Sequence, residues 1–367
     1  MTIPVNRRAF VASGSAAVLA GCASLPSRTV APDCTPLPPV RVDPTRVIRS
    51  VAGLRPYRDG GFVVRREQLG DKVLVHNYGH GGAGITLSWG SSKLATDLGL
   101  PGHSGPVAVI GAGVMGLSTA RLVQEAGLPV TIYAKELPPH TTSNIAGGQI
   151  SPFGHYKENA VTPQWQAQFQ AAMAYSWRRF QIMVGEDYGI RWLPTYEQSK
   201  RQLLQGDWLD PYYPHGRTLA RREHPFPLED VVSFNTMYVE TGRYLRQMLT
   251  DFHTAGGVIR RRAFETPQDL AELPEALVFN CTGLGSHALF NDKDLRPVRG
   301  QLAVLLPQPE VRYATAGEWG YMFPRADGIL LGGTFEHHVW DTNPDPAAIA
   351  RIVESHKRFF AGFRCAA

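Results

Sequence analysis

A strand, a glycine-rich turn, a helix and a second strand follow one another between residues 106 and 134, and this unit constrains the fold more than any other. Pro106-Val-Ala-Val-Ile110 is a short apolar run that ends at the fingerprint Gly111-Ala-Gly-Val-Met-Gly116. Helical periodicity continues from 114 to 126, and Val130-Thr-Ile-Tyr-Ala134 is the next strand. The glycines allow a tight turn and a close approach of the backbone to a pyrophosphate at the helix N-terminus. A dinucleotide-binding α/β domain is therefore predicted.

An acidic residue that binds the adenosine ribose is expected at the end of the second strand of such a unit. Lys135 occupies the expected place and Glu136 follows it. Glu136 serves the ribose if the register shifts by one residue; otherwise it is a solvated loop charge.

The chain has 367 residues, 43% of them hydrophobic, which is enough for two interleaved domains with a sizeable core. The formal net charge is +5, and no extended Lys/Arg-rich stretch occurs. This mild charge argues against nucleic acid as a partner. The four cysteines have no metal-ligand spacing, so no metal site is predicted.

The N-terminus has the features of an export signal. Asn6-Arg-Arg-Ala-Phe10 precedes a small-residue apolar stretch and then Leu19-Ala-Gly-Cys22. The paired arginines resemble a twin-arginine signal, and Leu-Ala-Gly-Cys resembles a bacterial lipoprotein cleavage site, after which Cys22 is lipidated. We therefore predict a signal peptide over 1–21 and an exported periplasmic or cell-envelope lipoprotein that contacts the membrane through Cys22. The alternative is an Ala/Ser-rich leader with one cysteine.

The stretch 22–46 is rich in proline and poor in large apolar residues, which predicts an extended tether. Cys34 lies on this tether and Cys365 near the C-terminus. Nothing in the sequence brings these two cysteines together, so whether they form a disulfide stays open. Cys281 lies in an apolar strand and is expected to be a buried free thiol.

Further elements follow from the pattern of apolar residues. Aromatic residues and methionine recur at helical intervals between Trp165 and Gly185, and Trp192 to Asp230 is expected to form loops and strands. A second strand–helix–strand set of the nucleotide domain comprises a helix over 243–255 and strands at 258–259 and 277–283. A buried strand is expected at 329–333 and an amphipathic helix at 347–360.

Eight motifs, each occurring once, resemble those of the D-amino-acid oxidase and D-aspartate oxidase family of FAD enzymes. The resemblance runs from about Val47 to about Phe360. The motifs are Gly111–Gly116, Thr141-Thr-Ser-Asn-Ile-Ala-Gly-Gly148, Asn280-Cys-Thr-Gly283, Arg299-Gly-Gln301, Tyr321-Met-Phe-Pro324, Leu331-Gly-Gly333, Gly53-Leu-Arg-Pro56 and His76–Trp89.

The order of these motifs differs from the family order. In the family the fingerprint comes first, and the arginine and glycine-rich segments come last; here both precede the fingerprint. Because each motif occurs once, a circular permutation explains the order better than a duplication. The resemblance thus implies a Rossmann-type FAD-binding domain interleaved with an α+β substrate domain that contains an antiparallel sheet, in permuted order. The expected boundaries are a permuted segment at 47–99, a linker at 100–105, an FAD-binding domain at 106–160 and 236–300, and a substrate domain at 161–235 and 301–360.

The resemblance implies FAD as the cofactor and assigns its binding residues. Besides Glu136, they are Gly111, Ala112, Gly113, Val114, Met115 and Gly116 of the fingerprint; Thr141, Thr142, Ser143, Gly147, Gly148 and Gln149; Phe264 and Thr282; and Gly81, Gly82, Ala83, Gly84, Ile85 and Thr86 of the glycine-rich loop.

Three residues match the family's catalytic positions. Arg55 matches the arginine that pairs with the substrate α-carboxylate, a task for which the planar guanidinium fork is suited. Tyr321 matches a tyrosine whose hydroxyl helps to hold the same carboxylate. Gly82 matches a glycine whose backbone carbonyl accepts a hydrogen bond from the substrate amine. Outside these motifs, a surface ion pair and a core aromatic would be the simpler interpretations of Arg55 and Tyr321.

One position departs from the family pattern. Relatives of the mammalian enzymes carry a lid tyrosine four residues before the Tyr321 position, where this chain has Gly317. A short lid is therefore expected, with a pocket that is more open or walled by Trp319. Acidic substrates would need another basic group, for which Arg325 and His337 are candidates.

The resemblance implies oxidative deamination of D-amino acids to 2-oxo acids, ammonia and hydrogen peroxide, with hydride transfer from Cα to flavin N5. Two alternatives stay open. One is a flavin-dependent amino acid dehydrogenase that passes electrons to a quinone, and the other is a non-catalytic flavin-binding lipoprotein. A resemblance to glycine or sarcosine oxidases shares the fingerprint but not the Gly53–Arg58 and His76–Trp89 segments.

Overall fold

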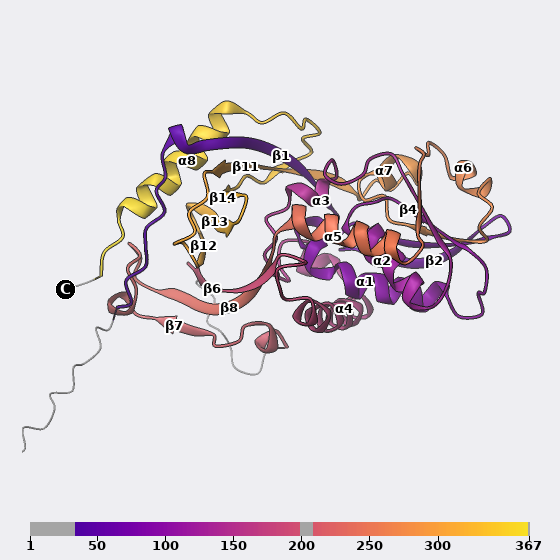
Figure 1. Ribbon diagram of the computed structural model, residues 1–367, viewed down its shortest axis with the longest axis horizontal. Helices are drawn as coiled ribbons and strands as arrows, with labels where there is room; N and C mark the ends of the chain where they lie inside the picture. The colour runs from indigo at the N-terminus through magenta and orange to yellow at the C-terminus, as the bar shows by residue number, and fades with distance from the viewer. Residues whose placement is uncertain (1–33, 199–207, 366–367) are drawn as a thin grey trace, which may run out of the picture. The chain divides into compact units, whose positions relative to one another are not determined.

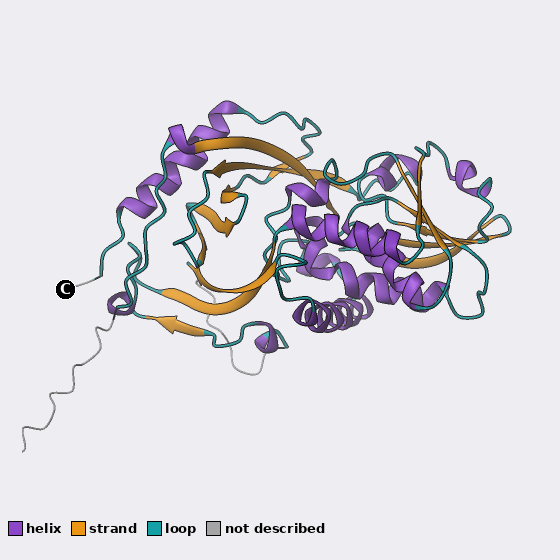
Figure 2. Ribbon diagram, viewed as in Figure 1, coloured by secondary structure: helices purple, strands orange, loops and turns teal. Residues whose placement is uncertain are grey.

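The computed structural model describes residues 34–198 and 208–365, which form two β-sheets with flanking helices (Figures 1 and 2). The predicted signal segment and Cys22 lie outside these residues. The sheets share several connecting segments, since the chain passes back and forth between them. The predicted α/β fold with an antiparallel sheet in the second domain is confirmed.

The first sheet has six strands and carries the fingerprint. Its order is β2-β3-β10-β4-β5-β9. The strands β3, β10, β4, β5 and β9 are parallel, and β2 pairs antiparallel with β3 at one edge. The strand bounds are β2 Val63–Leu69, β3 Lys72–Tyr78, β4 Val107–Ile110, β5 Val130–Ala134, β9 Val258–Arg261 and β10 Leu277–Asn280.

Both faces of this sheet are apolar, as expected for a parallel sheet covered on both sides. Val107 and Val109 of β4 point into one hydrophobic cluster, and Ala108 and Ile110 point into another. Because side chains alternate along a strand, the continuous apolar run at 106–110 serves both clusters.

Helices cover each face of the six-stranded sheet. On one face lie α1 (Gly84–Gly99), α2 (Val114–Glu125), α4 (Pro163–Ile182) and α5 (Thr241–Thr254), whose apolar residues share one cluster with the sheet (Figure 1). On the other face lie α6 (Pro267–Ala271) and α7 (Gly285–Leu289).

The helix α4 corrects the predicted domain boundary at residue 161. The sequence assigned this helix to the substrate domain, but it packs against α1 in the nucleotide-domain core. A Cβ on Gly90 of α1 would lie 1.8 Å from the carbonyl oxygen of Ala172, so the two helices approach more closely than any other residue allows. Ser176 Oγ accepts a hydrogen bond from the Gly90 backbone N–H at 2.8 Å.

The second sheet has nine strands, in the order β1-β11-β14-β13-β12-β6-β8-β7, with β15 paired to β11. All pairs are antiparallel except β12 with β6. The bounds are β1 Val47–Tyr57, β6 Ile190–Glu197, β7 Arg217–Leu219, β8 Val231–Val239, β11 Arg296–Leu305, β12 Ala314–Gly317, β13 Gly320–Arg325, β14 Gly328–Gly332 and β15 Glu336–His337.

The boundaries predicted at residues 235/236 and 300/301 fall inside strands of this sheet. β8 and β11 each belong entirely to it. The chain therefore leaves the second sheet later than predicted, after Val239, and enters it again earlier than predicted, at Arg296. The segment 47–99, which was predicted as one unit, is also divided: β1 joins the second sheet, whereas β2, β3 and α1 belong to the nucleotide domain.

The two faces of the second sheet have different partners. The predicted amphipathic helix at 347–360 is α8 (Pro346–Ala361), which packs on one face against Met322 and Ile329. Tyr321 and Phe323, its alternating neighbours on β13, lie in a different cluster with Leu302 and Leu330. The alternation of side chains along β13 thus orients Tyr321 away from the main α8 cluster.

Short helices complete the chain. They are α3 (Thr142–Ile145) and the 3₁₀ segments η1 (Pro44–Arg46), η2 (Gly81–Ala83), η3 (Glu158–Ala160), η4 (Asp210–Tyr212) and η5 (Arg221–Glu223). In the described part of the chain, no helix combines the length and the apolar character needed to cross a bilayer.

Residues 34–46 differ from the predicted tether because they pack against the folded unit. Val40 and Val42 are buried in the cluster beneath α8. Tyr313 Oη donates to the carbonyl of Pro38 at 2.7 Å, and the Arg41 backbone N–H donates to Gln308 at 2.8 Å. Proline content predicted an extended backbone, but the two valines bury enough surface to fix it.

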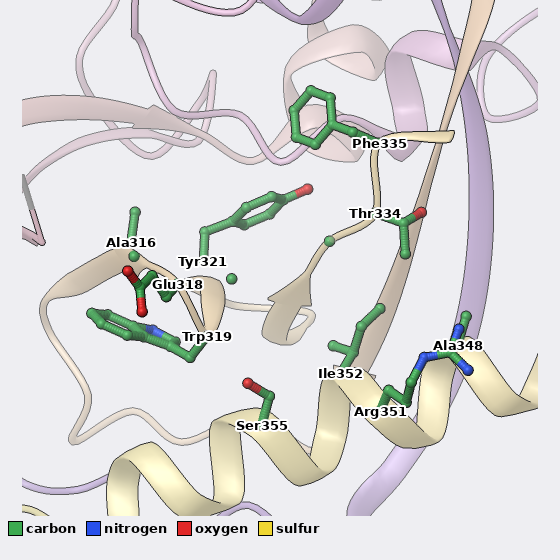
Figure 3. A pocket seen from close by; sticks show the side chains of 13 residues that line it. Ala316, Glu318, Trp319, Tyr321, Thr334, Phe335, Ala348, Arg351, Ile352 and Ser355 are labelled. Atoms are coloured by element: carbon green, nitrogen blue, oxygen red, sulfur yellow. The ribbon is translucent and has the colours of Figure 1, made fainter. Parts of the chain in front are cut away.

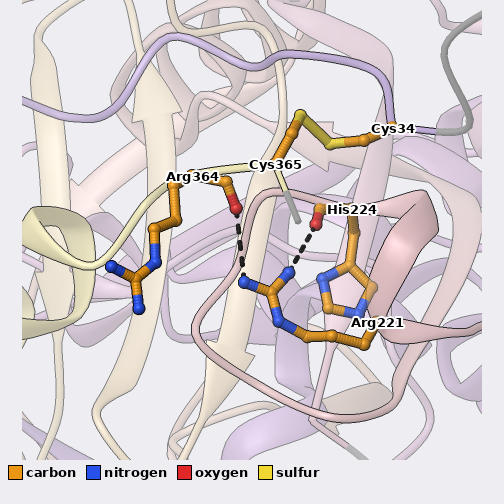
Figure 4. Close-up of a disulfide and its surroundings, with 5 residues drawn as sticks. All are labelled: Cys34, Arg221, His224, Arg364 and Cys365. Atoms are coloured by element: carbon orange, nitrogen blue, oxygen red, sulfur yellow. Dashed lines mark hydrogen bonds between the residues drawn. A yellow bond between two sulfur atoms is a disulfide. The ribbon is translucent and has the colours of Figure 1, made fainter. Parts of the chain in front are cut away.

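A disulfide joins Cys34 to Cys365, two residues 331 positions apart in the chain (Figure 4). The C-terminal segment beside it is held by Arg364, whose backbone N–H donates to Pro225 at 2.8 Å and whose carbonyl accepts from Arg221 at 3.3 Å. The two ends of the described unit are therefore adjacent and covalently linked. Cys281 is a buried free thiol, as predicted, and burial raises its pKa to about 12.

Candidate functional site

A cavity of about 1190 Å³ lies at the carboxyl ends of the parallel strands and extends to the second sheet. Its lining includes Tyr78, Ile110, Ala134 and Cys281, at or just after the ends of β3, β4, β5 and β10. Ligands of open α/β sheets bind at this edge. The volume exceeds the roughly 300–1,000 Å³ that a single small ligand usually needs. The cavity therefore has room for a dinucleotide together with a substrate.

The fingerprint glycines are required by the local geometry. Gly111 has a φ of +107°, and a Cβ there would lie 2.6 Å from the carbonyl oxygen of Cys281. A Cβ on Gly116 would lie 1.9 Å from the carbonyl oxygen of Gly111. The first glycine thus permits the turn, and the last permits α2 to pack against it.

The N-terminus of α2 faces the cavity. Gly113 is the N-cap residue and has no side chain to satisfy the first-turn N–H groups. Ser143 Oγ accepts from the Val114 N–H at 3.0 Å, which brings the 141–149 segment beside the helix end. Free N–H groups and the helix dipole at such an end favour a pyrophosphate.

The part of the cavity that follows β5 is suited to an adenosine. Glu136 and Lys135 follow β5 and both line the cavity, together with Arg262 and Phe264. The Phe264 ring lies edge-on to Tyr133 and receives the Arg262 guanidinium at 4.9 Å. This geometry is compatible with the register shift that lets Glu136 reach a ribose.

The glycine-rich loop packs tightly on the 153–155 segment. Gly81 has a φ of +51°, and a Cβ there would lie 2.9 Å from the Cα of His155. The Gly82 N–H donates to the Gly154 carbonyl at 3.3 Å. The loop leads directly through η2 into α1, so its backbone is fixed on both sides.

Two buried histidines lie next to this loop. His80 stacks on Phe62 with ring centroids 5.0 Å apart, and His155 packs on Phe169 at 4.8 Å. Both are almost fully buried. Burial lowers the pKa of each imidazole to about 3, and for His80 the nearby His155 adds to this effect. Both rings are therefore neutral at physiological pH.

Arg55 lies at the end of β1 and lines the cavity. Its Nη1 donates to the Thr334 carbonyl at 3.0 Å, and its guanidinium lies 4.2 Å from the centroid of the Phe335 ring. A Cβ on Gly82 would lie 3.8 Å from Arg55 Cδ. The predicted arginine and the predicted glycine carbonyl are therefore neighbours.

Tyr321 stands beside Arg55. Burial raises the pKa of its phenol, and the charge and hydrogen bond of Arg55 oppose part of that rise. The Tyr321 ring stacks on Phe323, and a Cβ on Gly332 of the neighbouring strand would lie 2.1 Å from Tyr321 Cζ. The structure thus brings together all three residues predicted to be catalytic.

Most residues predicted to bind the cofactor line the same cavity. The exceptions are Gly116, Ala83 and Thr86, which do not line it. Gly116 packs α2 on the turn, Ala83 is buried at the start of α1, and Thr86 Oγ1 accepts from the Ser151 N–H at 3.0 Å. The lining residues are Gly111, Ala112, Gly113, Val114, Met115, Glu136, Thr141, Thr142, Ser143, Gly147, Gly148, Gln149, Phe264, Thr282, Gly81, Gly82, Gly84 and Ile85.

Sequence reasoning missed Gly300, Thr334 and Phe335, which surround the Arg55 side chain. Arg299-Gly-Gln301 was recognised as a motif, but no sequence signal connected it to Arg55. The connection arises only from the pairing of β1 with β11.

A second cavity of about 400 Å³ adjoins the first (Figure 3). Tyr321 and Phe335 line both cavities. Trp319 lines the smaller one and not the larger, so it does not wall the main cavity in the way the sequence suggested. Its ring lies across Gly317, where a Cβ would be 2.3 Å from the indole.

The two basic residues considered for acidic substrates do not line either cavity. Arg325 is bound by both carboxylate oxygens of Asp327, at 2.8 and 2.7 Å. His337 is exposed and lies edge-on to Tyr57. Arg325 is engaged by Asp327, and His337 lies outside both cavities, so neither residue is placed to serve as the second cation.

The residues of the large cavity fit FAD. The glycine turn and the N-terminus of α2 are suited to the pyrophosphate. On one side of them lie Glu136 and Phe264, and on the other lie Arg55 and Tyr321. In the described ranges, no group of three or more His, Cys, Asp and Glu side chains is arranged to hold a metal ion.

Comparison with known proteins agrees with this geometry. Residues 28–98 and 106–367 match the model of the DAO family, described as FAD dependent oxidoreductase. A D-amino-acid oxidase of Streptomyces coelicolor is 34% identical over 268 residues, covering 68% of this chain and 76% of that protein. A D-amino-acid oxidase of Dictyostelium discoideum is 30% identical over 250 residues, covering 67% and 70%.

The solved structures agree on the fold. Glycine oxidase from Bacillus cereus has a TM-score of 0.52 and 18% sequence identity, covering 68% of this chain and 77% of that one. The chain belongs to the DAO family of FAD-dependent oxidoreductases, and FAD is its cofactor.

The two buried histidines predict a pH-dependent stability. Their pKa values near 3 in the folded state lie below the ordinary value of 6.5, so the unfolded state binds more protons between these pH values. The contribution of these histidines to the free energy of unfolding is therefore fully present above about pH 6.5. It decreases on acidification, by up to about 1.4 kcal/mol per pH unit for each histidine.

Thermal unfolding at pH 7.5 and pH 5.0 measures this effect. We expect His155→Gln to reduce the pH-dependent part of the change in Tm, whereas His253→Gln, at an exposed position on α5, leaves it unchanged. Equal pH dependence in the wild type and both variants would contradict the assignment.

Proposed function

We propose that this protein uses FAD to oxidise D-amino acids to 2-oxo acids. The observation that carries the proposal is the grouping of Arg55, Tyr321 and Gly82 in the same cavity that the fingerprint lines. The names of the D-amino-acid oxidases among its relatives support the same activity.

In the proposed reaction, a D-amino acid, oxygen and water yield a 2-oxo acid, ammonia and hydrogen peroxide. FAD, held in the large cavity, would supply the hydride acceptor for this reaction and the route of both electrons to the final acceptor. The protein's own task is to bind and orient the amino acid so that its Cα–H faces the flavin.

Arg55 supplies the charge for this orientation. Its guanidinium donates one N–H to the Thr334 carbonyl and is hydrogen-bonded to the Tyr321 side chain. We assign other N–H groups of the guanidinium to the substrate α-carboxylate. The raised pKa of Tyr321 keeps its hydroxyl protonated at neutral pH, so it can donate to the same carboxylate. The Gly82 carbonyl is assigned to accept from the substrate amine, which fixes a second substituent of Cα besides the carboxylate.

Anaerobic titration of the purified protein with D- and L-amino acids tests the function. We expect loss of the oxidised flavin absorbance with D-isomers only. In Arg55→Ala, the apparent Kd for the substrate should rise by at least about 30-fold, since a charge-assisted bidentate contact contributes about 2 kcal/mol or more. Flavin that no D-amino acid reduces would contradict the proposal. Under air, one hydrogen peroxide per turnover identifies oxygen as the acceptor, whereas little hydrogen peroxide indicates another acceptor such as a quinone.

We also infer that the chain is a circular permutation of the family order. Three observations support this inference. The family model matches in two pieces separated by 99–105, the relatives match about 68% of the chain, and residues 34 and 365 are adjacent. The disulfide then closes the position at which the family chain is continuous.

A rearranged chain, residues 106–367 followed by 28–98, tests the permutation. We expect it to fold and bind FAD. Cys365→Ser should destabilise the present order more than the rearranged one by about 3 kcal/mol, because the disulfide closes a 331-residue separation in one and only a short loop in the other. Failure of the rearranged chain to bind flavin would contradict the inference.

We propose in addition that the protein is exported and lipidated at Cys22. The paired arginines and the Leu19–Cys22 motif motivate this proposal. The Cys34–Cys365 disulfide supports an oxidising compartment, because such bonds persist outside the reducing cytosol.

Fractionation of bacteria that express the full chain tests the location. We expect the wild type with the membranes, Cys22→Ala in the soluble exported fraction, and the double variant Arg7→Lys/Arg8→Lys inside the cell. Wild-type protein in the cytosolic fraction would contradict both parts of the proposal.

A further inference from the structure

The Arg55 guanidinium lies directly over Gly300 of the neighbouring strand. Gly53 pairs with Gly300, and Arg55 pairs with Val298, so Gly300 is the diagonal neighbour of Arg55. Long side chains reach such diagonal positions in a sheet. A Cβ on Gly300 would lie 2.4 Å from Arg55 Nη2 and 2.5 Å from both Cζ and Nη1. The guanidinium occupies the space that any side chain at 300 would fill.

The opposite face of the guanidinium is covered by Phe335. The ring centroid lies 4.2 Å from Arg55 Cζ, within the range of a cation–π contact. Phe335 is 61% exposed, so its ring forms the outer layer between Arg55 and solvent. Thr334, one residue earlier, accepts from Nη1 at the edge of the guanidinium.

The loop that carries Thr334 and Phe335 is fastened to β11 by the residues on each side of Gly300. Arg299 forms an ion pair with Glu336, and Gln301 Nε2 donates to Glu336 at 2.7 Å. The Gln301 N–H also donates to Thr334 Oγ1 at 3.1 Å. Side chains alternate along β11, so the outer two residues of Arg299-Gly-Gln301 hold the loop and the central glycine leaves room for Arg55.

We propose that Gly300 and Phe335 are positioning residues that hold the Arg55 guanidinium in one plane for the substrate carboxylate. With one face on Gly300, the other under Phe335 and one N–H on Thr334, the fork loses little rotational freedom when a carboxylate binds. The ring also excludes water from the ion pair, which strengthens it. This inference rests on the proposed carboxylate-binding role of Arg55.

The test compares Gly300→Ala, Phe335→Leu and Phe335→Trp with the control Gly242→Ala, a helical position at which an added Cβ meets no atom within 4 Å. Calorimetry with FAD-loaded protein gives the Kd values of benzoate and of benzamide, which lacks the charge. We expect Gly300→Ala to weaken benzoate at least about tenfold, Phe335→Leu about three- to tenfold, and Phe335→Trp less than Phe335→Leu. Benzamide binding, FAD content and Tm should change much less.

Two results would overturn the inference. One is benzoate affinity within twofold of the wild type in both Gly300→Ala and Phe335→Leu. The other is an equal loss for benzoate and benzamide, which would indicate a general disturbance of the site. If Gly300→Ala does not fold, the benzoate and benzamide affinities of Phe335→Leu and Phe335→Trp test the inference. Wild type that binds benzoate but is not reduced by D-amino acids would refute the proposed function without refuting the positioning of Arg55.

Discussion

The antiparallel pairing of β1 with β11 is the interaction on which the site depends. It joins residues 47–57 to residues 296–305, segments about 250 residues apart in the chain, in an unbroken register from Arg49 to Tyr57. The pairing carries Arg55 to the cavity, places it beside Gly300 and lets β1 continue into the antiparallel edge strand β2 of the other sheet. One ladder thus connects Arg55, the proposed substrate-binding arginine, to the nucleotide domain.

The part of the cavity formed by Arg55 and Tyr321, where we propose that the substrate carboxylate binds, is built on glycines rather than on additional polar side chains. Arg55 lies over Gly300 and Tyr321 lies over Gly332, each at distances that exclude a methyl group. The arginine side chain has many rotamers and the tyrosine side chain is large, so holding both flat against bare backbone limits the conformations that compete with the binding geometry. At this end of the cavity, shape complementarity therefore contributes to the chemistry.

The disulfide and the linker have complementary places in the fold. The 99–105 segment connects two parts that the family model treats separately, and Cys34–Cys365 joins the two ends of the described unit. Residues 34–46 pack beneath α8 through Val40 and Val42. The beginning of β1, the strand that carries Arg55, is therefore anchored by the disulfide and by hydrophobic contacts together.

The sequence by itself determined the nucleotide domain, because its signals are local: a strand, a glycine turn and a helix within 30 residues fix their own geometry. It also predicted Arg55, Tyr321 and Gly82 as the substrate-binding residues, because the motifs that carry them are made of residues adjacent in the chain. Only the tertiary structure decided the place of α4, the burial of Val40 and Val42, the disulfide, and the roles of Gly300 and Phe335. These depend on contacts between distant segments, and no local pattern encodes which strand lies beside which. Trp319 illustrates the same limit. The sequence suggested that its large ring walls the main cavity, but the fold lays the ring across Gly317, where it borders the smaller cavity.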